Sequence, residues 1–150
     1  MPGNFIFAPV DKKTTLQTGL AAAPFYFKAL SFCALLGVSQ DITPDAIDLI
    51  FRFFRTLPSG SELVREFRPP PVLMPAAEAA FFDTAAALSA ARGEPWLMRW
   101  RPAELKTRLE GLGFVDVFHL TPETANARYF NYQNDDLSAW SAVQMIRARV

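Results

Sequence analysis

The sequence has little of what disulfide, metal or polyanion chemistry requires. It holds one cysteine and one histidine in 150 residues, so no disulfide can form within the chain and no spaced set of metal ligands is present. Lysine plus arginine equals aspartate plus glutamate, at 15 each, which gives no general attraction to nucleic acid or to an anionic membrane. We therefore expect no metal site, no nucleic-acid partner and no membrane partner.

Long apolar runs are also missing. No stretch reaches the roughly 18 apolar residues of a membrane-spanning helix, and no basic segment followed by a long apolar core opens the sequence. These absences predict a soluble cytoplasmic protein. With 51% apolar residues and 14 phenylalanines, a single domain over residues 1–150 has ample material for a core. Cys33 lies in an apolar run and is interpreted as a small buried side chain.

Short apolar runs alternate with amphipathic ones, which predicts an α/β fold with helices on both faces of a sheet. Strands are expected at 5–10, 29–38, 61–67, 114–120 and 143–150, and helices at 16–23, 44–57, 75–92 and 102–112. Thr43 and Pro44 supply an N-cap and a first helical residue. The apolar composition of 29–38 is typical of a parallel strand covered on both faces.

No catalytic residue can be assigned from spacing. His119 lies in a strand-like alternation and is interpreted as structural or exposed, and Asp135-Asp136 is interpreted as a turn. Ser59-Gly60-Ser61 leads into a strand and lacks the context of a nucleophile elbow. Asp11 follows the first predicted strand, where α/β sheets bind ligands, although a solvated loop acid is an equal interpretation. None of the seven glycines forms a glycine-rich cofactor turn.

Six segments in a characteristic order point to a family. They are Phe7-Ala8-Pro9-Val10-Asp11, Leu35-Leu36-Gly37-Val38, Leu57-Pro58-Ser59-Gly60-Ser61-Glu62, Gly93-Glu94-Pro95-Trp96, Leu112-Gly113-Phe114 and Asn126-Ala127-Arg128-Tyr129-Phe130. Together they make the chain resemble the C-terminal portion of class I S-adenosyl-L-methionine-dependent methyltransferases of the leucine carboxyl methyltransferase-like group, particularly its bacterial O-methyltransferase subfamily.

The resemblance implies a fold and a cofactor site. The fold is part of a Rossmann-like sheet with strand order 3-2-1-4-5-7-6 and an antiparallel last strand. This chain would supply strands 3 to 7, with residues 143–150 between 61–67 and 114–120. The resemblance places Asp11 near the adenine of S-adenosyl-L-methionine, and Leu36, Gly37 and Val38 along the cofactor cleft.

The resemblance also implies that the cofactor site is incomplete, because the glycine-rich first half of the fold is missing. We expect a truncated or split methyltransferase half, weak or inactive alone, acting by O-methyl transfer on a small-molecule or carboxyl acceptor. The alternative is a non-catalytic α/β interaction domain. Without strands 1 and 2, the strand at 29–38 would be an exposed sheet edge, which invites a homodimer or a complementing N-terminal half.

Overall fold

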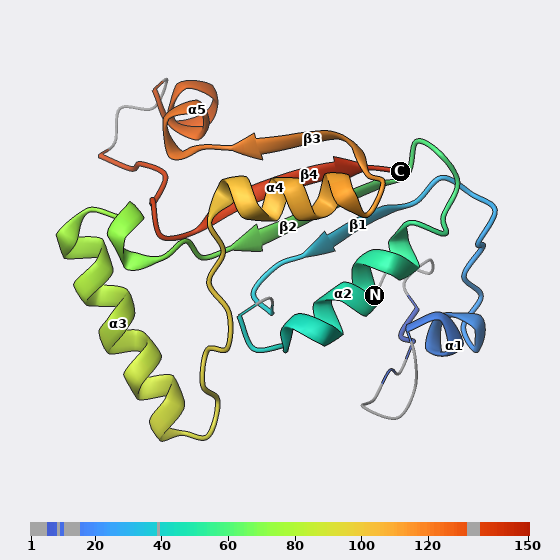
Figure 1. Cartoon of the computed structure of the whole chain (residues 1–150), viewed down its shortest axis with the longest axis horizontal. Helices are drawn as coiled ribbons and strands as arrows, with labels where there is room; N and C mark the ends of the chain where they lie inside the picture. Colours follow the sequence, from blue (N-terminus) through green and yellow to red (C-terminus); the bar gives the residue numbers. More distant parts are fainter. Residues whose placement is uncertain (1–5, 9, 11–15, 39, 132–135) are drawn as a thin grey trace.

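The computed structural model describes residues 6–8, 10, 16–38, 40–131 and 136–150 (Figure 1). In chain order the elements are α1 (Leu16–Ala21), β1 (Phe32–Leu35), α2 (Pro44–Phe54), β2 (Glu62–Phe67), the 3-10 turn η1 (Pro71–Leu73), α3 (Ala76–Ala91), α4 (Pro102–Gly111), β3 (Val115–Leu120), α5 (Pro122–Ala125), the π-helical turn η2 (Asn126–Phe130) and β4 (Gln144–Arg149). In the described part of the chain, no helix is long and apolar enough to cross a membrane.

The sheet has the predicted order and directions. Its four strands lie in the order β1-β2-β4-β3, with β1 parallel to β2 and with β4 antiparallel to both of its neighbours. The last strand of the chain therefore lies between the second and third, as expected for strands 4-5-7-6. The α/β fold class is confirmed.

The strand predicted at 5–10 is not found in the described residues. Residues 6–8 and 10 have no regular secondary structure, and Ile6 and Phe7 are 56% and 74% exposed. In the expected order two further strands separate this segment from β1. A strand is stable in water only when it pairs with other strands in a sheet, so apolar alternation alone does not produce one.

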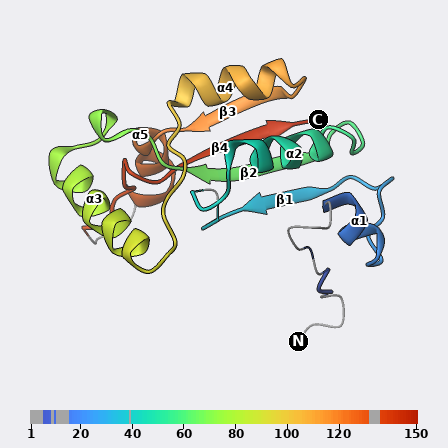
Figure 2. The ribbon, with the colours of Figure 1, turned by 60° about the horizontal axis from the view of Figure 1, so that its bottom comes forward.

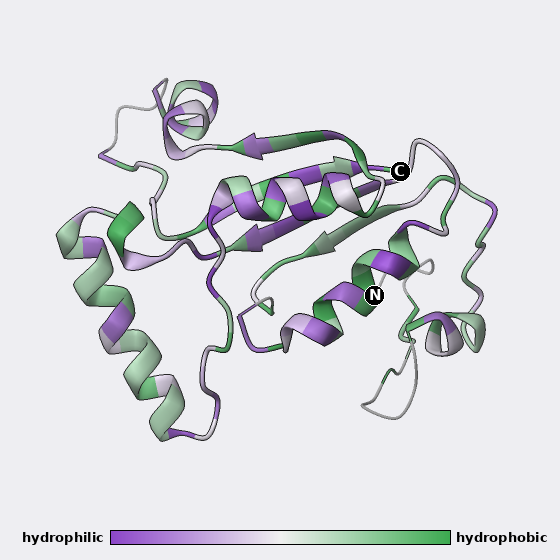
Figure 3. Cartoon of the chain, in the orientation of Figure 1, coloured by the Kyte–Doolittle hydropathy of each residue, from purple (hydrophilic) through white to green (hydrophobic). Residues whose placement is uncertain are grey.

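The α2 helix forms as its sequence predicts, although it ends at Phe54 and not near residue 57. The Thr43 hydroxyl accepts a hydrogen bond from the Ala46 amide, and Pro44 occupies the first turn. Ile47 and Phe51 are fully buried against the sheet. Figure 3 shows the resulting alternation of hydrophobic and hydrophilic segments along α2.

The core occupies one face of the sheet. Helices α2 and α4 lie across this face in both views (Figures 1 and 2). Leu63 and Phe67 of β2 and Ile146 of β4 point into the core, together with Leu105 and Leu109 of α4. We call this the core face, and the opposite one the open face.

The open face corrects the interpretation of 29–38 as a strand covered on both sides. The strand β1 is four residues long, lies at the sheet edge, and leaves Phe32 68% exposed. On the same face, Met145 of β4 is 37% exposed. The apolar composition of 29–38 predicted burial on both faces, because parallel sheets usually have helices on both faces. Here α2 and α4 cover only the core face.

Candidate functional site

Three chain segments leave the sheet at one edge. Strands β2 and β3 are both antiparallel to β4, and β1 is parallel to β2, so the carboxyl ends of β1, β2 and β3 lie together. Helices α3 and α5 flank this edge at the left of Figure 1. In α/β sheets the region outside the carboxyl ends of the strands is where ligands bind. This carboxyl edge is the candidate functional site.

The predicted cofactor residues Leu36, Gly37 and Val38 lie at this edge, directly after β1. Gly37 has φ +74°, a left-handed conformation that favours glycine, and no atom lies within 4 Å of an added Cβ. Leu36 and Val38 are 51% and 46% exposed. The turn thus presents apolar side chains and an open backbone to solvent. Asp11, the fourth predicted cofactor residue, lies outside the described residues.

Gln40 fixes this turn, although it is not among the site residues predicted from the sequence. Its side chain is 7% exposed, and its Nε2 donates to the Gly37 carbonyl at 3.2 Å and to Asp41 Oδ2 at 3.0 Å. The Gln40 carbonyl accepts from the Leu97 amide at 2.7 Å, which ties the loop before α4 to the end of β1. A polar residue after a turn is expected to be solvated, so no sequence pattern indicates this burial.

Arg68 follows β2 and is held in an aromatic cluster. Its guanidinium carbon lies 4.6 Å from the Trp96 ring centroid and 4.9 Å from that of Phe82, the one buried residue of α3. Burial lowers the pKa of Arg68, against the attraction of nearby Glu66. Trp140 stacks edge-on against Phe82 at 5.5 Å. The cluster joins residues far apart in the sequence, so linear spacing could not predict it.

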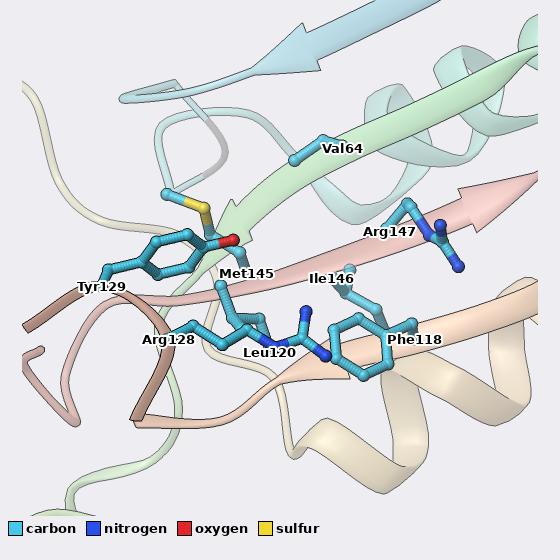
Figure 4. A pocket seen from close by; sticks show the side chains of 8 residues that line it. All are labelled: Val64, Phe118, Leu120, Arg128, Tyr129, Met145, Ile146 and Arg147. Atoms are coloured by element: carbon cyan, nitrogen blue, oxygen red, sulfur yellow. The ribbon is translucent and has the colours of Figure 1, made fainter. Parts of the chain in front are cut away.

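A hollow of about 410 Å³ lies on the open face near the same edge (Figure 4). Its lining residues come from the three strands β2, β4 and β3 and from η2: Val64, Phe118, Leu120, Arg128, Tyr129, Met145, Ile146 and Arg147. The guanidinium carbons of Arg128 and Arg147 lie 5.3 Å and 5.9 Å from the Phe118 ring centroid. The hollow therefore combines apolar walls with two cations.

His119 has a structural environment, one of the two interpretations made from the sequence. Its Nε2 lies 2.7 Å from Gln144 Oε1, and its ring centroid is 5.5 Å from that of Phe67. Within the described ranges, no group of three or more His, Cys, Asp or Glu side chains could hold a metal ion. His119 is thus a half-buried contact between β3 and β4.

Cys33 is half-buried on β1, and we expect it to react slowly with iodoacetamide near neutral pH. Burial raises the pKa of its thiol from 9.0 to about 11, which lowers the thiolate fraction about 100-fold. The rate should rise to that of a free thiol in denaturing urea, and mass spectrometry measures both rates. Fast alkylation of the folded chain would contradict this.

The burial of Cys33 also affects the pH dependence of stability. As pH rises, the thiol loses its proton in the unfolded chain before it does so in the folded chain. The contribution of Cys33 to the free energy of unfolding therefore falls as pH rises above about 9.

Comparison with known proteins gives one curated relative. No family model matches the sequence. The chain is 27% identical over 149 residues to the Bacillus subtilis (strain 168) protein named "Putative S-adenosyl-L-methionine-dependent methyltransferase YktD". The match covers 99% of this chain and 49% of that protein, so the chain spans about half the length of the relative.

Two solved structures share the fold at low sequence identity. A DUF574 family protein from Streptomyces avermitilis superposes with a TM-score of 0.56 and 20% identity, over 87% of this chain and 50% of that one. A "putative O-methyltransferase" from Nostoc punctiforme gives a TM-score of 0.53 and 15% identity, over 83% of this chain and 33% of that one. The described part of the chain therefore has part of a class I methyltransferase fold.

Proposed function

We propose that this chain forms the strand 4 to 7 part of an S-adenosyl-L-methionine-dependent methyltransferase. The observation that carries the proposal is the position of β4, which is inserted antiparallel between β2 and β3. This is the strand order that the family resemblance predicts. The 27% identity to the YktD protein, along nearly the whole chain, supports the same assignment.

The chain offers part of a cofactor surface. Gly37 leaves space for close approach, and the exposed Leu36 and Val38 side chains suit the apolar ring of an adenosine. When bound, S-adenosyl-L-methionine would supply an electrophilic methyl group. The residues at the carboxyl edge would orient the cofactor and exclude water, because methyl transfer depends mainly on alignment of donor and acceptor. Asp11 remains a predicted adenine contact.

The finer assignment concerns the acceptor and the partner. We propose O-methyl transfer to a small-molecule or carboxyl acceptor, as in the leucine carboxyl methyltransferase-like group, and low activity of this chain alone. The edge of β1 that pairs with no described strand is the surface for a complementing N-terminal half or for a second copy, and Phe32 is 68% exposed on the adjoining open face. A non-catalytic interaction domain would use the same edge but would not bind the cofactor.

Titration with S-adenosyl-L-methionine tests the proposal. We expect the 150-residue chain to bind more weakly than about 100 μM, because it supplies only part of the polar contacts. Amide chemical shifts measured by NMR should change at Leu36, Gly37 and Val38 at millimolar cofactor. Unchanged shifts there would favour the non-catalytic domain, and low-micromolar binding would contradict an incomplete site.

The chain offers a matched pair of glycine variants. Gly37 and Gly93 both have positive φ, at +74° and +86°, and neither has an atom within 4 Å of an added Cβ. Substitution by alanine strains both turns, but Gly93 follows α3, away from the β1 turn. Gly37→Ala should reduce the cofactor-induced shifts and Gly93→Ala should not. Equal effects would show that the β1 turn is not the contact.

A further inference from the structure

The hollow on the open face has features of a ligand site that are independent of the β1 turn. Its walls belong to β2, β4, β3 and η2, whereas Leu36, Gly37 and Val38 follow β1, the outer strand on the side of β2 away from β4. Its volume of about 410 Å³ lies within the range of small-molecule sites. The floor is apolar, with Val64 and Met145 contributed by paired strands.

The two arginines of the hollow differ in their charge partners. Arg147 donates to Asp116 Oδ2 at 2.7 Å and has Glu62 at 3.8 Å, so carboxylates balance its charge. Arg128 forms no ion pair with any residue that the structure describes, and its side chain is exposed. Figure 4 shows the Arg128 guanidinium extended beside Phe118 along the wall of the hollow. Arg128 is therefore a cation available to a ligand.

We propose that this hollow binds a small apolar molecule that carries one acidic group, with the acidic group paired to Arg128. A planar guanidinium binds a carboxylate through two parallel hydrogen bonds, and the neighbouring aromatic ring shields that pair from water. The apolar body of the ligand packs against Leu120 and Met145. Binding requires no S-adenosyl-L-methionine, so this proposal stands or falls separately from the proposed function.

Titration of the whole chain with 3-phenylpropanoate and with its neutral amide, 3-phenylpropanamide, tests the site without cofactor. The two probes have the same apolar body and differ in charge. We expect the acid to bind at least about tenfold more tightly than the amide, because only the acid pairs with the guanidinium. The chemical shifts of the backbone N–H groups of Phe118, Leu120 and Met145, measured by NMR, should change when the acid is added. Equal affinities, no binding, or shifts confined to other segments would overturn the proposal.

Charge-matched variants identify the cation. Arg128→Gln should lower the affinity for 3-phenylpropanoate until it equals the affinity for 3-phenylpropanamide. The affinity for 3-phenylpropanamide itself should not change. Arg52→Gln removes one exposed arginine from α2, which covers the core face, and should change neither affinity. Both side chains are exposed, so neither substitution removes a core contact. A loss of acid binding equal in both variants would indicate nonspecific attraction and would refute the Arg128 assignment.

Discussion

Replacing Phe51 with alanine is expected to lower the free energy of unfolding by about 3–5 kcal/mol. The Phe51 side chain is fully buried between α2 and the sheet, and its ring packs edge-on against Phe114 at 6.5 Å. Removing it takes away the burial of a large apolar group and leaves a cavity that the close-packed core fills only in part. Domains are marginally stable, at about 5–15 kcal/mol, so a large part of the folding free energy would be lost.

Urea denaturation followed by circular dichroism measures this change. Leu49→Ala is the matched control, because Leu49 lies on the same helix but is 68% exposed. It should change the free energy of unfolding by less than about 0.5 kcal/mol. If Phe51→Ala were as stable as Leu49→Ala, the placement of α2 on the core face would be wrong.

Replacing Arg65 with methionine is expected to raise the free energy of unfolding by about 1–3 kcal/mol at neutral pH. Arg65 lies in the middle of β2, is 1% exposed, and points under α2 and α4. No described residue accepts a hydrogen bond from its Nη1 or Nη2. Stacking on Phe51 at 5.3 Å and Trp100 at 5.8 Å offsets only part of the desolvation of this charge.

The increase in the free energy of unfolding that is expected for Arg65→Met depends on pH, and the direction of this dependence follows from the pKa of Arg65. Burial lowers the pKa of Arg65 to about 10, opposed by the attraction of Glu66. The unfolded chain therefore holds this proton more tightly, and the destabilising contribution of Arg65 to the parent chain decreases as pH rises above about 10. The advantage of Arg65→Met should be full below that pH and should shrink above it.

Arg52→Met is the control for this substitution, because Arg52 is exposed on α2. Parallel urea titrations of the two variants give the comparison. Arg52→Met should leave stability nearly unchanged. A large loss of stability in Arg65→Met would mean that the stacked guanidinium is a net stabilising group and would contradict the argument from desolvation.

The sequence by itself determined helices α1 to α4 and four of the five predicted strands, but not the short α5 and η2. Thr43 and Pro44 start α2, and Gly113, with φ +92°, ends the α4 region, because caps and positive φ are local properties of the chain. The order of the strands followed from the family resemblance and not from periodicity. That order placed β4 correctly between β2 and β3.

Tertiary structure alone decided which groups are covered and which are brought together. Arg65 is charged and reads as a solvent-facing residue, yet β-strand alternation between Leu63 and Phe67 carries it into the core. The hollow joins Val64 to Met145 and Arg128 across long sequence separations. The apolar residues of 29–38 suggested burial on both faces and those of 5–10 suggested a strand, but both outcomes also require a neighbouring strand or helix. Local patterns carry no information about whether that neighbour is present.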